Sequence, residues 1–216
     1  MSITRKPFDN CPQFMTDATL EQEALICLDY YQQKTGHPHS EKYQVRAEQI
    51  CEYLLDEHDF TYYLDEDIHM PKDSKYWTYT EGNEVLGYTN FTDKEVHIKQ
   101  KNLSDRTAFV HETKHGIHDS RFVQPSFLAK EHERLEIQAK TFSRFFLLPK
   151  HVFVPRFYQM DNGHRDFSDV LSYLMDDFKV SGRTILIRAR ELNLISENIK
   201  KFLWHKKNFL KKNPHP

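Results

Sequence analysis

The sequence has few cysteines and no long apolar run. Its 216 residues include only Cys11, Cys27 and Cys51, and none of them forms a CxxC pair. This spacing predicts neither a disulfide framework nor a zinc site built from cysteines. Residues 1–15 contain no apolar core of a signal peptide, and nowhere do 18 apolar residues run together. We therefore expect a cytoplasmic protein without a membrane span.

An excess of charge of one sign is also lacking. The chain has 30 Lys and Arg residues against 32 Asp and Glu residues, which gives a formal net charge of -2 at pH 7. This near balance predicts no dominant nucleic-acid or acidic-substrate partner. The sequence also lacks internal repeats and low-complexity linkers. A chain of this length can bury one core, so we expect a single α+β domain in which helices flank one small antiparallel sheet.

The most informative stretch is a HExxH pentapeptide that begins at His111 and ends at His115. It lies within residues 106–120, which are predicted to form a helix because no proline interrupts them. In a helix the two histidines lie one turn apart on one face, close enough for both imidazoles to bind one zinc ion. Glu112 then lies beside the metal, where it can deprotonate a water molecule.

The pentapeptide alone also has a structural interpretation. A chain with 13 histidines contains HExxH by chance in roughly one case in twenty, and chance matches usually lie on solvated helix faces. A hydrogen-bonded core cluster without metal is a related alternative. A working catalytic site needs a third protein ligand, because catalytic zinc keeps its fourth position open. Our candidate for that ligand is Glu136.

A second predicted helix carries Glu136 and ends at Pro149. Its apolar residues share one side: Leu135, Ala139, Phe142 and Phe146. Glu136 shares that buried side, where a carboxylate is costly unless it is paired or bound to metal. A ligand role is therefore favoured, and a buried salt bridge to an arginine is the structural alternative.

Three motifs in this order resemble the ImmA/IrrE family of metallopeptidases. They are His111 to His115, then Glu136-x-x-Ala139-x-x-Phe142-Ser143-x-x-x-Leu147-Leu148-Pro149, then Val180-Ser181 through Ile185, Arg188, Leu192 and Ile195. The resemblance covers about residues 41–195. It implies a gluzincin-like site in which His111, His115 and Glu136 bind Zn2+ and Glu112 is the catalytic base. It also implies site-specific cleavage of a helix-turn-helix transcriptional repressor.

The chain departs from the family pattern at four positions. Thr113 and Lys114 replace the Leu-Gly that the family usually has inside its HExxH motif, and Gln138 and Lys140 replace acidic or amide residues around the motif alanine. These differences leave the partner that orients a ligand imidazole unidentified. They motivate a second hypothesis, a regulator with a weak or inactive metal site that acts by binding a repressor or DNA.

The remaining histidines allow further roles. His118 follows His115 by three residues on nearly the same helix face, so it is a candidate fourth ligand or a group that touches a ligand. A metzincin site is excluded, because its third histidine would fall at Arg121. His132 has no assigned role. The group that assists zinc in holding the oxyanion is also open, with three candidates: Tyr158, His164 and Arg188.

Apolar spacing predicts the other elements. Residues 16–33 and 41–56 read as helices, and four strands at 60–64, 76–80, 84–90 and 95–100 read as an antiparallel meander. After Pro149 the chain is predicted to be helical, and Ser181 can cap a helix that packs against the core. A helix-turn-helix there is disfavoured, because residues 185–187 are apolar.

We divide the chain into three segments that together form one compact unit. Residues 1–40 are an N-terminal helical extension, residues 41–195 are the metallopeptidase domain and residues 196–216 are a basic C-terminal tail. The tail interleaves six lysines with aromatic and apolar residues, which fits either a docked helix or an amphipathic helix that binds an anionic partner. We expect a protein substrate and no membrane partner, and direct nucleic-acid binding is left open.

Overall fold

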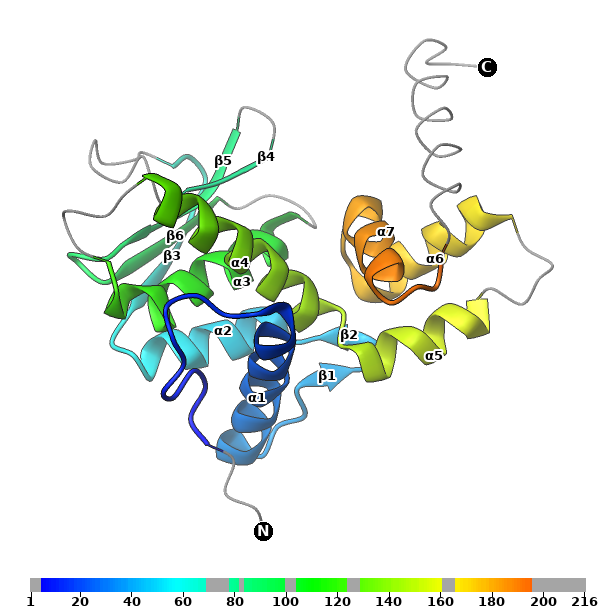
Figure 1. Ribbon diagram of the computed structural model, residues 1–216, viewed down its shortest axis with the longest axis horizontal. Helices are drawn as coiled ribbons and strands as arrows, with labels where there is room; N and C mark the ends of the chain where they lie inside the picture. Colours follow the sequence, from blue (N-terminus) through cyan, green and yellow to red (C-terminus); the bar gives the residue numbers. More distant parts are fainter. Residues whose placement is uncertain are drawn as a thin grey trace.

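The computed structural model describes residues 5–68, 78–81, 84–99, 104–123, 129–160 and 166–195 (Figure 1). Within these ranges the chain has the predicted α+β fold, with helices α1 to α7, a four-stranded sheet and a separate two-stranded ladder. The basic tail, the start of the second predicted strand and the last residue of the fourth lie outside the described residues. None of the helices in the described ranges combines the length and apolar character needed to cross a membrane.

The first helix, α1 (Asp17–Thr35), belongs to the main core. Thr16 caps its N-terminus by accepting a hydrogen bond from the Thr19 amide (3.2 Å), and Gly36 ends it in the left-handed region at φ 72°. Its buried residues are Leu20, Glu23, Ala24, Cys27, Leu28, Tyr30 and Tyr31. The helix packs against α2 (Ala47–Asp56) and α4 (Ala129–Leu147). Its bounds confirm the helix predicted at residues 16–33.

The main sheet has the strand order β3-β6-β5-β4. Its strands are β3 (Thr61–Asp65), β4 (Thr78–Glu81), β5 (Glu84–Asn90) and β6 (Glu95–Lys99). The β4–β5 and β5–β6 pairs are antiparallel, as expected, but β3 pairs in parallel with β6. The predicted meander is therefore wrong for its first strand. Alternation of apolar and polar residues fixes which face of a strand is buried, whereas it says nothing about which strand lies beside it.

The HExxH segment lies in α3 (Ser104–Ile117), which is the central helix of the core. It packs against α2, α4, β5 and β6 (Figure 1). The helix crosses α2 closely at Gly116, where an added Cβ would lie 3.0 Å from the Leu55 side chain and 3.4 Å from the Phe60 ring. Residues 111–115 are all buried, so this part of α3 is enclosed on every side and does not present a solvated face.

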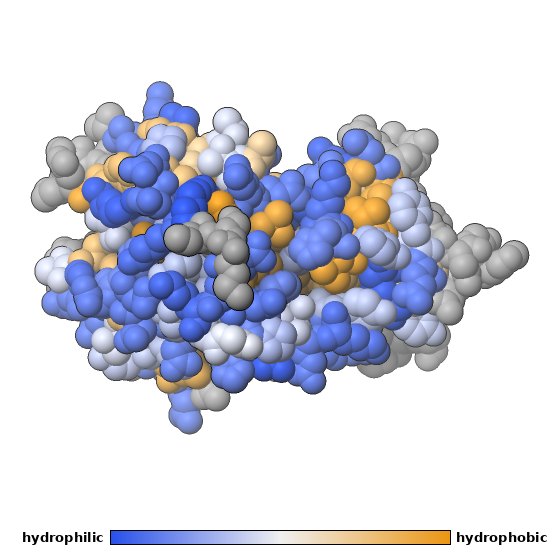
Figure 2. All heavy atoms as spheres, turned by 90° about the horizontal axis from the view of Figure 1, so that it is seen from below, coloured by the Kyte–Doolittle hydropathy of each residue, from blue (hydrophilic) through white to orange (hydrophobic). Residues whose placement is uncertain are grey.

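The C-terminal part consists of short helices joined to the core through α4. They are α5 (Lys150–Met160), α6 (Phe167–Phe178) and α7 (Gly182–Glu191), with the ladder of β1 (Ser40–Glu41) and β2 (Gln44–Val45) beside them. Ser181 caps α7 as predicted, by accepting from the Thr184 amide, and Ile185 is buried in the core. Figure 2 shows a mostly hydrophilic surface with apolar side chains gathered toward the α5–α7 end.

Candidate metal centre

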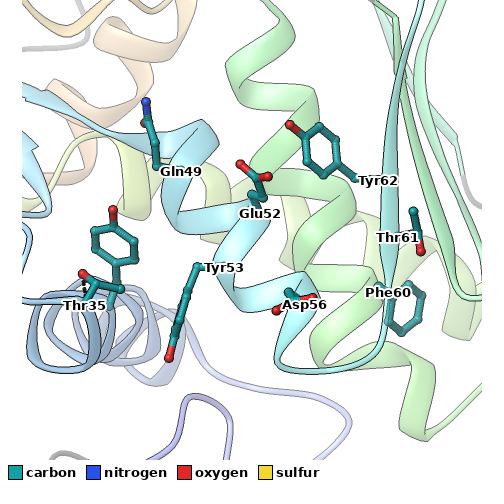
Figure 3. A pocket seen from close by; sticks show the side chains of 9 residues that line it. Thr35, Gln49, Glu52, Tyr53, Asp56, Phe60, Thr61 and Tyr62 are labelled. Carbon is teal, nitrogen blue, oxygen red and sulfur yellow. Dashed lines mark hydrogen bonds between the residues drawn. The ribbon is translucent and has the colours of Figure 1, made fainter.

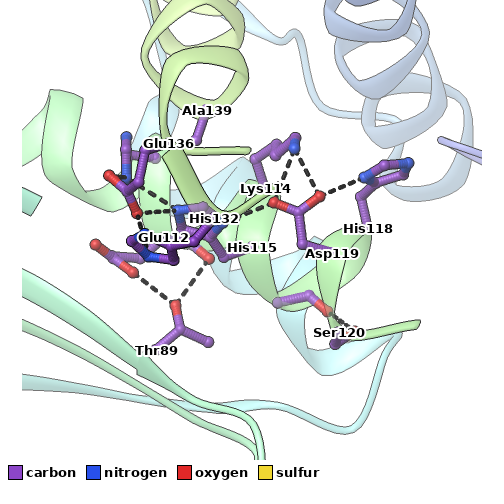
Figure 4. Close-up of polar contacts among 12 residues, drawn as sticks. Thr89, Glu112, Lys114, His115, His118, Asp119, Ser120, His132, Glu136 and Ala139 are labelled. Atoms are coloured by element: carbon purple, nitrogen blue, oxygen red, sulfur yellow. Dashed lines mark hydrogen bonds and ion pairs between the residues drawn. The ribbon is translucent and has the colours of Figure 1, made fainter. Parts of the chain in front are cut away.

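Helices α3 and α4 bring the three predicted ligands together (Figure 4). His115 Nε2 lies 3.0 Å from His111 Nε2 and 3.1 Å from Glu136 Oε1. His111 Nε2 lies 3.2 Å from Glu136 Oε2. All three residues are buried, and their ligand atoms lie within 4.8 Å of one another. We call these three residues the triad.

The triad has the spacing and chemistry of a metal site. Zinc–nitrogen and zinc–oxygen bonds of about 2.0–2.1 Å place neighbouring ligand atoms of a tetrahedron about 3.3–3.4 Å apart. The triad atoms are separated by 3.0–3.2 Å, so they need to move apart by only a few tenths of an ångström to reach that geometry. Two imidazoles and one carboxylate are also a donor set used by catalytic zinc. The triad can therefore hold a metal ion.

The protonation states of the triad differ. Burial lowers the pKa of His111 to about 4 and keeps that ring neutral. Burial also works to lower the pKa of His115, but hydrogen bonds to Asp119 and Glu136 outweigh it and raise this pKa to about 9. Burial works to raise the pKa of Glu136, and the two histidines more than offset this and hold it below its usual range. Glu136 is therefore a carboxylate, as a ligand must be.

The predicted base, Glu112, is held by strand β5. The Thr89 hydroxyl donates to Glu112 Oε2 (2.6 Å), and it also lies 3.3 Å from the Glu112 carbonyl oxygen. A Cβ added at Gly87 would lie 3.0 Å from Glu112 Cγ, so the strand leaves just enough space for the glutamate stem. Thr89 and Gly87 were not predicted from the sequence, because their position beside α3 depends on strand pairing.

Asp119 orients His115 through the ring nitrogen that does not face the other triad atoms. Its Oδ2 atom lies 2.7 Å from His115 Nδ1, which makes Nδ1 the donor and turns Nε2 toward the other triad atoms. The sequence had left this orienting partner unidentified. A signal was present, since Asp119 follows His115 by four residues and would share its helix face.

Lys114, His118 and Asp119 form a second buried polar group, which we call the rear cluster. Lys114 Nζ donates to both Asp119 oxygens (2.6 and 2.8 Å), and both side chains are fully buried. Burial works to raise the pKa of Asp119, but Lys114 and then the two histidines hold it well below its usual range. Lys114, a departure from the family pattern, thus neutralises the carboxylate that orients His115.

His118 belongs to the rear cluster and not to the triad. Its Nδ1 lies 2.6 Å from Asp119 Oδ1, and its Nε2 lies 3.2 Å from the Pro12 carbonyl oxygen. Burial lowers the pKa of His118, and the contact with Asp119 works in the opposite direction. Of the two roles considered for His118, this placement matches a group that touches the partner of a ligand.

Two further side chains lie at the rim of the triad on α4. His132 Nε2 is 3.7 Å from Glu136 Oε1, and Lys140 Nζ is 3.9 Å from Glu136 Oε2. The candidate oxyanion groups lie elsewhere or cannot be placed. Arg188 is buried and donates to the Leu148 carbonyl (3.1 Å), Tyr158 is exposed on α5, and His164 lies outside the described residues.

A groove of about 640 Å³ lies between α1, α2 and β3 (Figure 3). Tyr31, Glu52, Tyr53, Asp56 and Tyr62 are among the residues that line it, and none of the triad does. The chemistry that the sequence predicts therefore does not belong to this groove.

Two histidines one turn apart on α3 and a glutamate on α4 thus form a buried group that could bind a metal ion. The family model of the M78 peptidases, described as an IrrE N-terminal-like domain, matches residues 72–190, which is more than half of the chain. The chain therefore belongs to this family, as its motifs predict.

A solved structure with a similar fold is a Mycobacterium tuberculosis transcriptional regulator. The TM-score is 0.52 and the sequence identity is 14%, and the match covers 86% of this chain and 50% of the regulator. This chain thus spans about half the length of the regulator, and at this identity the likeness concerns the fold alone. A search of curated protein sequences finds no match.

Proposed function

We propose that the protein is a zinc-dependent endopeptidase. The observation that carries this proposal is the convergence of two imidazole nitrogens and the Glu136 carboxylate at 3.0–3.2 Å, with Glu112 next to His111 on the same helix (Figure 4). Membership of a peptidase family supports the same reaction class. Held by the triad, zinc would polarise the scissile carbonyl and lower the pKa of water at the site. His111, His115 and Glu136 are the proposed ligands.

Glu112 is the proposed general base. It takes a proton from the attacking water while the water oxygen bonds to the carbonyl carbon. It then gives this proton to the amide nitrogen as the carbon–nitrogen bond breaks. The Thr89 hydroxyl holds the carboxylate in one rotamer by donating to Oε2 (2.6 Å). Asp119 holds His115 with Nε2 facing the metal position.

A strand at the edge of the main sheet offers a mode of substrate binding. Strands β3 and β4 are the two edges of the main sheet, and of these β4 lies against α3, which carries the two triad histidines. An extended peptide could add to β4 as a further strand and place its backbone beside the metal centre. We propose a protein substrate of this kind, and the family resemblance suggests a helix-turn-helix repressor cut in the cytoplasm as part of transcription regulation.

Elemental analysis of metal bound per chain tests the site. We expect about one zinc in the wild type and a marked loss of zinc in Glu136→Ala. Glu112→Gln is the matched control, because it should keep zinc while cleavage of a quenched fluorescent peptide library falls by about 10²–10⁴-fold. Zinc-free wild-type protein that takes up none on titration, or a Glu112→Gln variant that cuts at the wild-type rate, would contradict the proposal.

A second candidate function is a regulator whose metal site does no chemistry. The Lys140 ammonium lies 3.9 Å from Glu136 Oε2, so a positive charge stands beside a proposed metal ligand. Replacing this lysine with asparagine should tighten zinc binding if its charge competes with the metal. Salt-dependent binding of the wild type to duplex DNA, without peptide cleavage, would favour this second candidate.

A further inference from the structure

The chain that precedes α1 crosses the back of the metal centre. We call residues 5–16 the N-terminal strap; they lie outside the segment that the family model matches. Phe8 of the strap is fully buried, with its ring centroid 4.9 Å from that of His118 and 5.3 Å from that of Phe142. The strap therefore forms part of the same core as the helices that carry the site.

Backbone atoms of the strap are bound at several points. Arg121 donates to the Phe8 carbonyl (3.1 Å), and Gln138 donates to the Met15 carbonyl (3.2 Å). The Phe8 amide donates to Glu23 (2.7 Å), a buried residue of α1 that also pairs with Arg5. Phe8 has a φ of 56°, a left-handed conformation that costs energy in a residue other than glycine. Tertiary contacts thus hold the strap in a shape that it would not adopt alone.

One contact links the strap to a proposed metal ligand. The Pro12 carbonyl lies 3.2 Å from His118 Nε2, and His118 Nδ1 lies 2.6 Å from Asp119 Oδ1. The other oxygen of Asp119 lies 2.7 Å from Nδ1 of His115. A continuous path of polar contacts therefore runs from the strap backbone to the imidazole that faces the metal position.

We propose that the N-terminal strap positions His115 through His118 and Asp119, so that docking of the strap and binding of zinc stabilise each other. This inference rests on the proposed function only for the presence of zinc in the triad. A docked strap fixes His118, His118 and Lys114 fix Asp119, and Asp119 holds the ligand ring. Coupling between two binding events is reciprocal, so zinc must tighten the strap to the same extent that the strap tightens zinc.

Hydrogen exchange of the full wild-type chain, with and without zinc, measures one direction of the coupling. We expect zinc to slow exchange in peptides that cover residues 5–16, including the Phe8 amide, by roughly threefold to tenfold. Peptides from α6 and α7, which are remote from the triad, provide the internal control and should not change. Exchange in the strap that is the same with and without zinc would overturn the proposal.

Zinc affinity of an Arg121 variant measures the other direction. Arg121→Met removes the side-chain bonds to the Phe8 carbonyl and to the His118 carbonyl (3.2 Å) while leaving the Asp119 side chain in place, and we expect zinc to bind roughly threefold to tenfold more weakly in a chelator competition. Arg121→Lys keeps a donor and should recover part of the affinity. The matched control is Arg156→Met. It removes a largely buried ion pair between Arg156 of α5 and Asp177 of α6, away from the triad, and should leave zinc affinity unchanged.

The outcomes separate this inference from the proposed function. Wild-type protein that binds zinc while Arg121→Met binds it equally well overturns the coupling and leaves the metal site intact. Wild-type protein that binds zinc without cleaving any peptide overturns the peptidase reaction, whereas the coupling is still measured by exchange and affinity. Wild-type protein that binds no zinc overturns both.

Discussion

The triad and the rear cluster are two buried polar groups that meet where His115 Nδ1 contacts Asp119 Oδ2, and their charges are accommodated differently. In the rear cluster the carboxylate of Asp119 has its own ammonium, Lys114, at 2.6 and 2.8 Å, so its charge is balanced within the fold. In the triad two imidazoles and a carboxylate turn their ligand atoms toward one point. A buried group that neutralises itself is suited to holding structure, whereas one that converges donor atoms is suited to binding a cation.

Removing the carboxylate of the rear cluster should have the largest effect on the metal-free protein. Asp119→Ala leaves the Lys114 ammonium buried without its partner. We expect the free energy of unfolding, measured by urea denaturation, to fall by about 3–5 kcal/mol. Glu136→Ala should cost less in the same metal-free assay, because it leaves no buried ammonium unpaired. If this comparison is right, the double replacement Lys114→Met with Asp119→Leu recovers most of the loss. A double variant as unstable as Asp119→Ala would show that charge balance is not what the cluster provides.

A smaller effect, on catalysis, is expected from changing Thr89 of β5, which contacts Glu112. Thr89→Val keeps the shape of the side chain but removes the donor to Glu112, and hydrogen bonds to charged groups contribute about 1.5–3 kcal/mol. We expect unchanged zinc content and peptide cleavage that falls by at least about tenfold. Thr89→Ser keeps the hydroxyl and serves as the control. Loss of zinc from Thr89→Val would mean that the strand supports the triad itself.

The smallest predicted effect concerns His58, which among the described residues lacks a carboxylate partner like the one that Asp119 provides for His115. Burial, and then Lys6 and Arg121, lower the pKa of His58 to about 4. In the unfolded chain this pKa is about 6.5, so the unfolded state binds more protons between these values. His58 therefore contributes stability above pH 6.5 that is lost as the pH falls toward 4. His58→Asn should reduce the pH dependence of the free energy of unfolding over this range by no more than about 1 kcal/mol, since the ring is only half-buried, and the thermal midpoint should then change less with pH. A midpoint that still falls as steeply would assign the loss to other groups.

The parts of the site that the sequence predicted are those that local spacing determines. Helical periodicity places His111 and His115 on one face, and the apolar stripe of α4 places Glu136 on its buried side. Thr89 could not be found in this way, because the neighbour of α3 is decided by the pairing of β5 with β6. The parallel position of β3 depends on the course of the chain between distant strands, which alternation within a strand does not encode. Lys114 looked like a departure from a motif because its partner, Asp119, lies beyond the end of the helix.

The burial of residues 111–115 also determines when during folding a metal ion can enter the site. An isolated segment with this composition forms little helix, so the one-turn spacing of His111 and His115 exists only after the neighbouring elements have docked. Glu136 comes from a separate helix that must dock as well. A metal ion bound by the triad would then find its ligands in the native state and not in the transition state that leads to it. We therefore expect the ion to slow unfolding while leaving the folding rate unchanged, which makes it a determinant of how long the folded protein lasts.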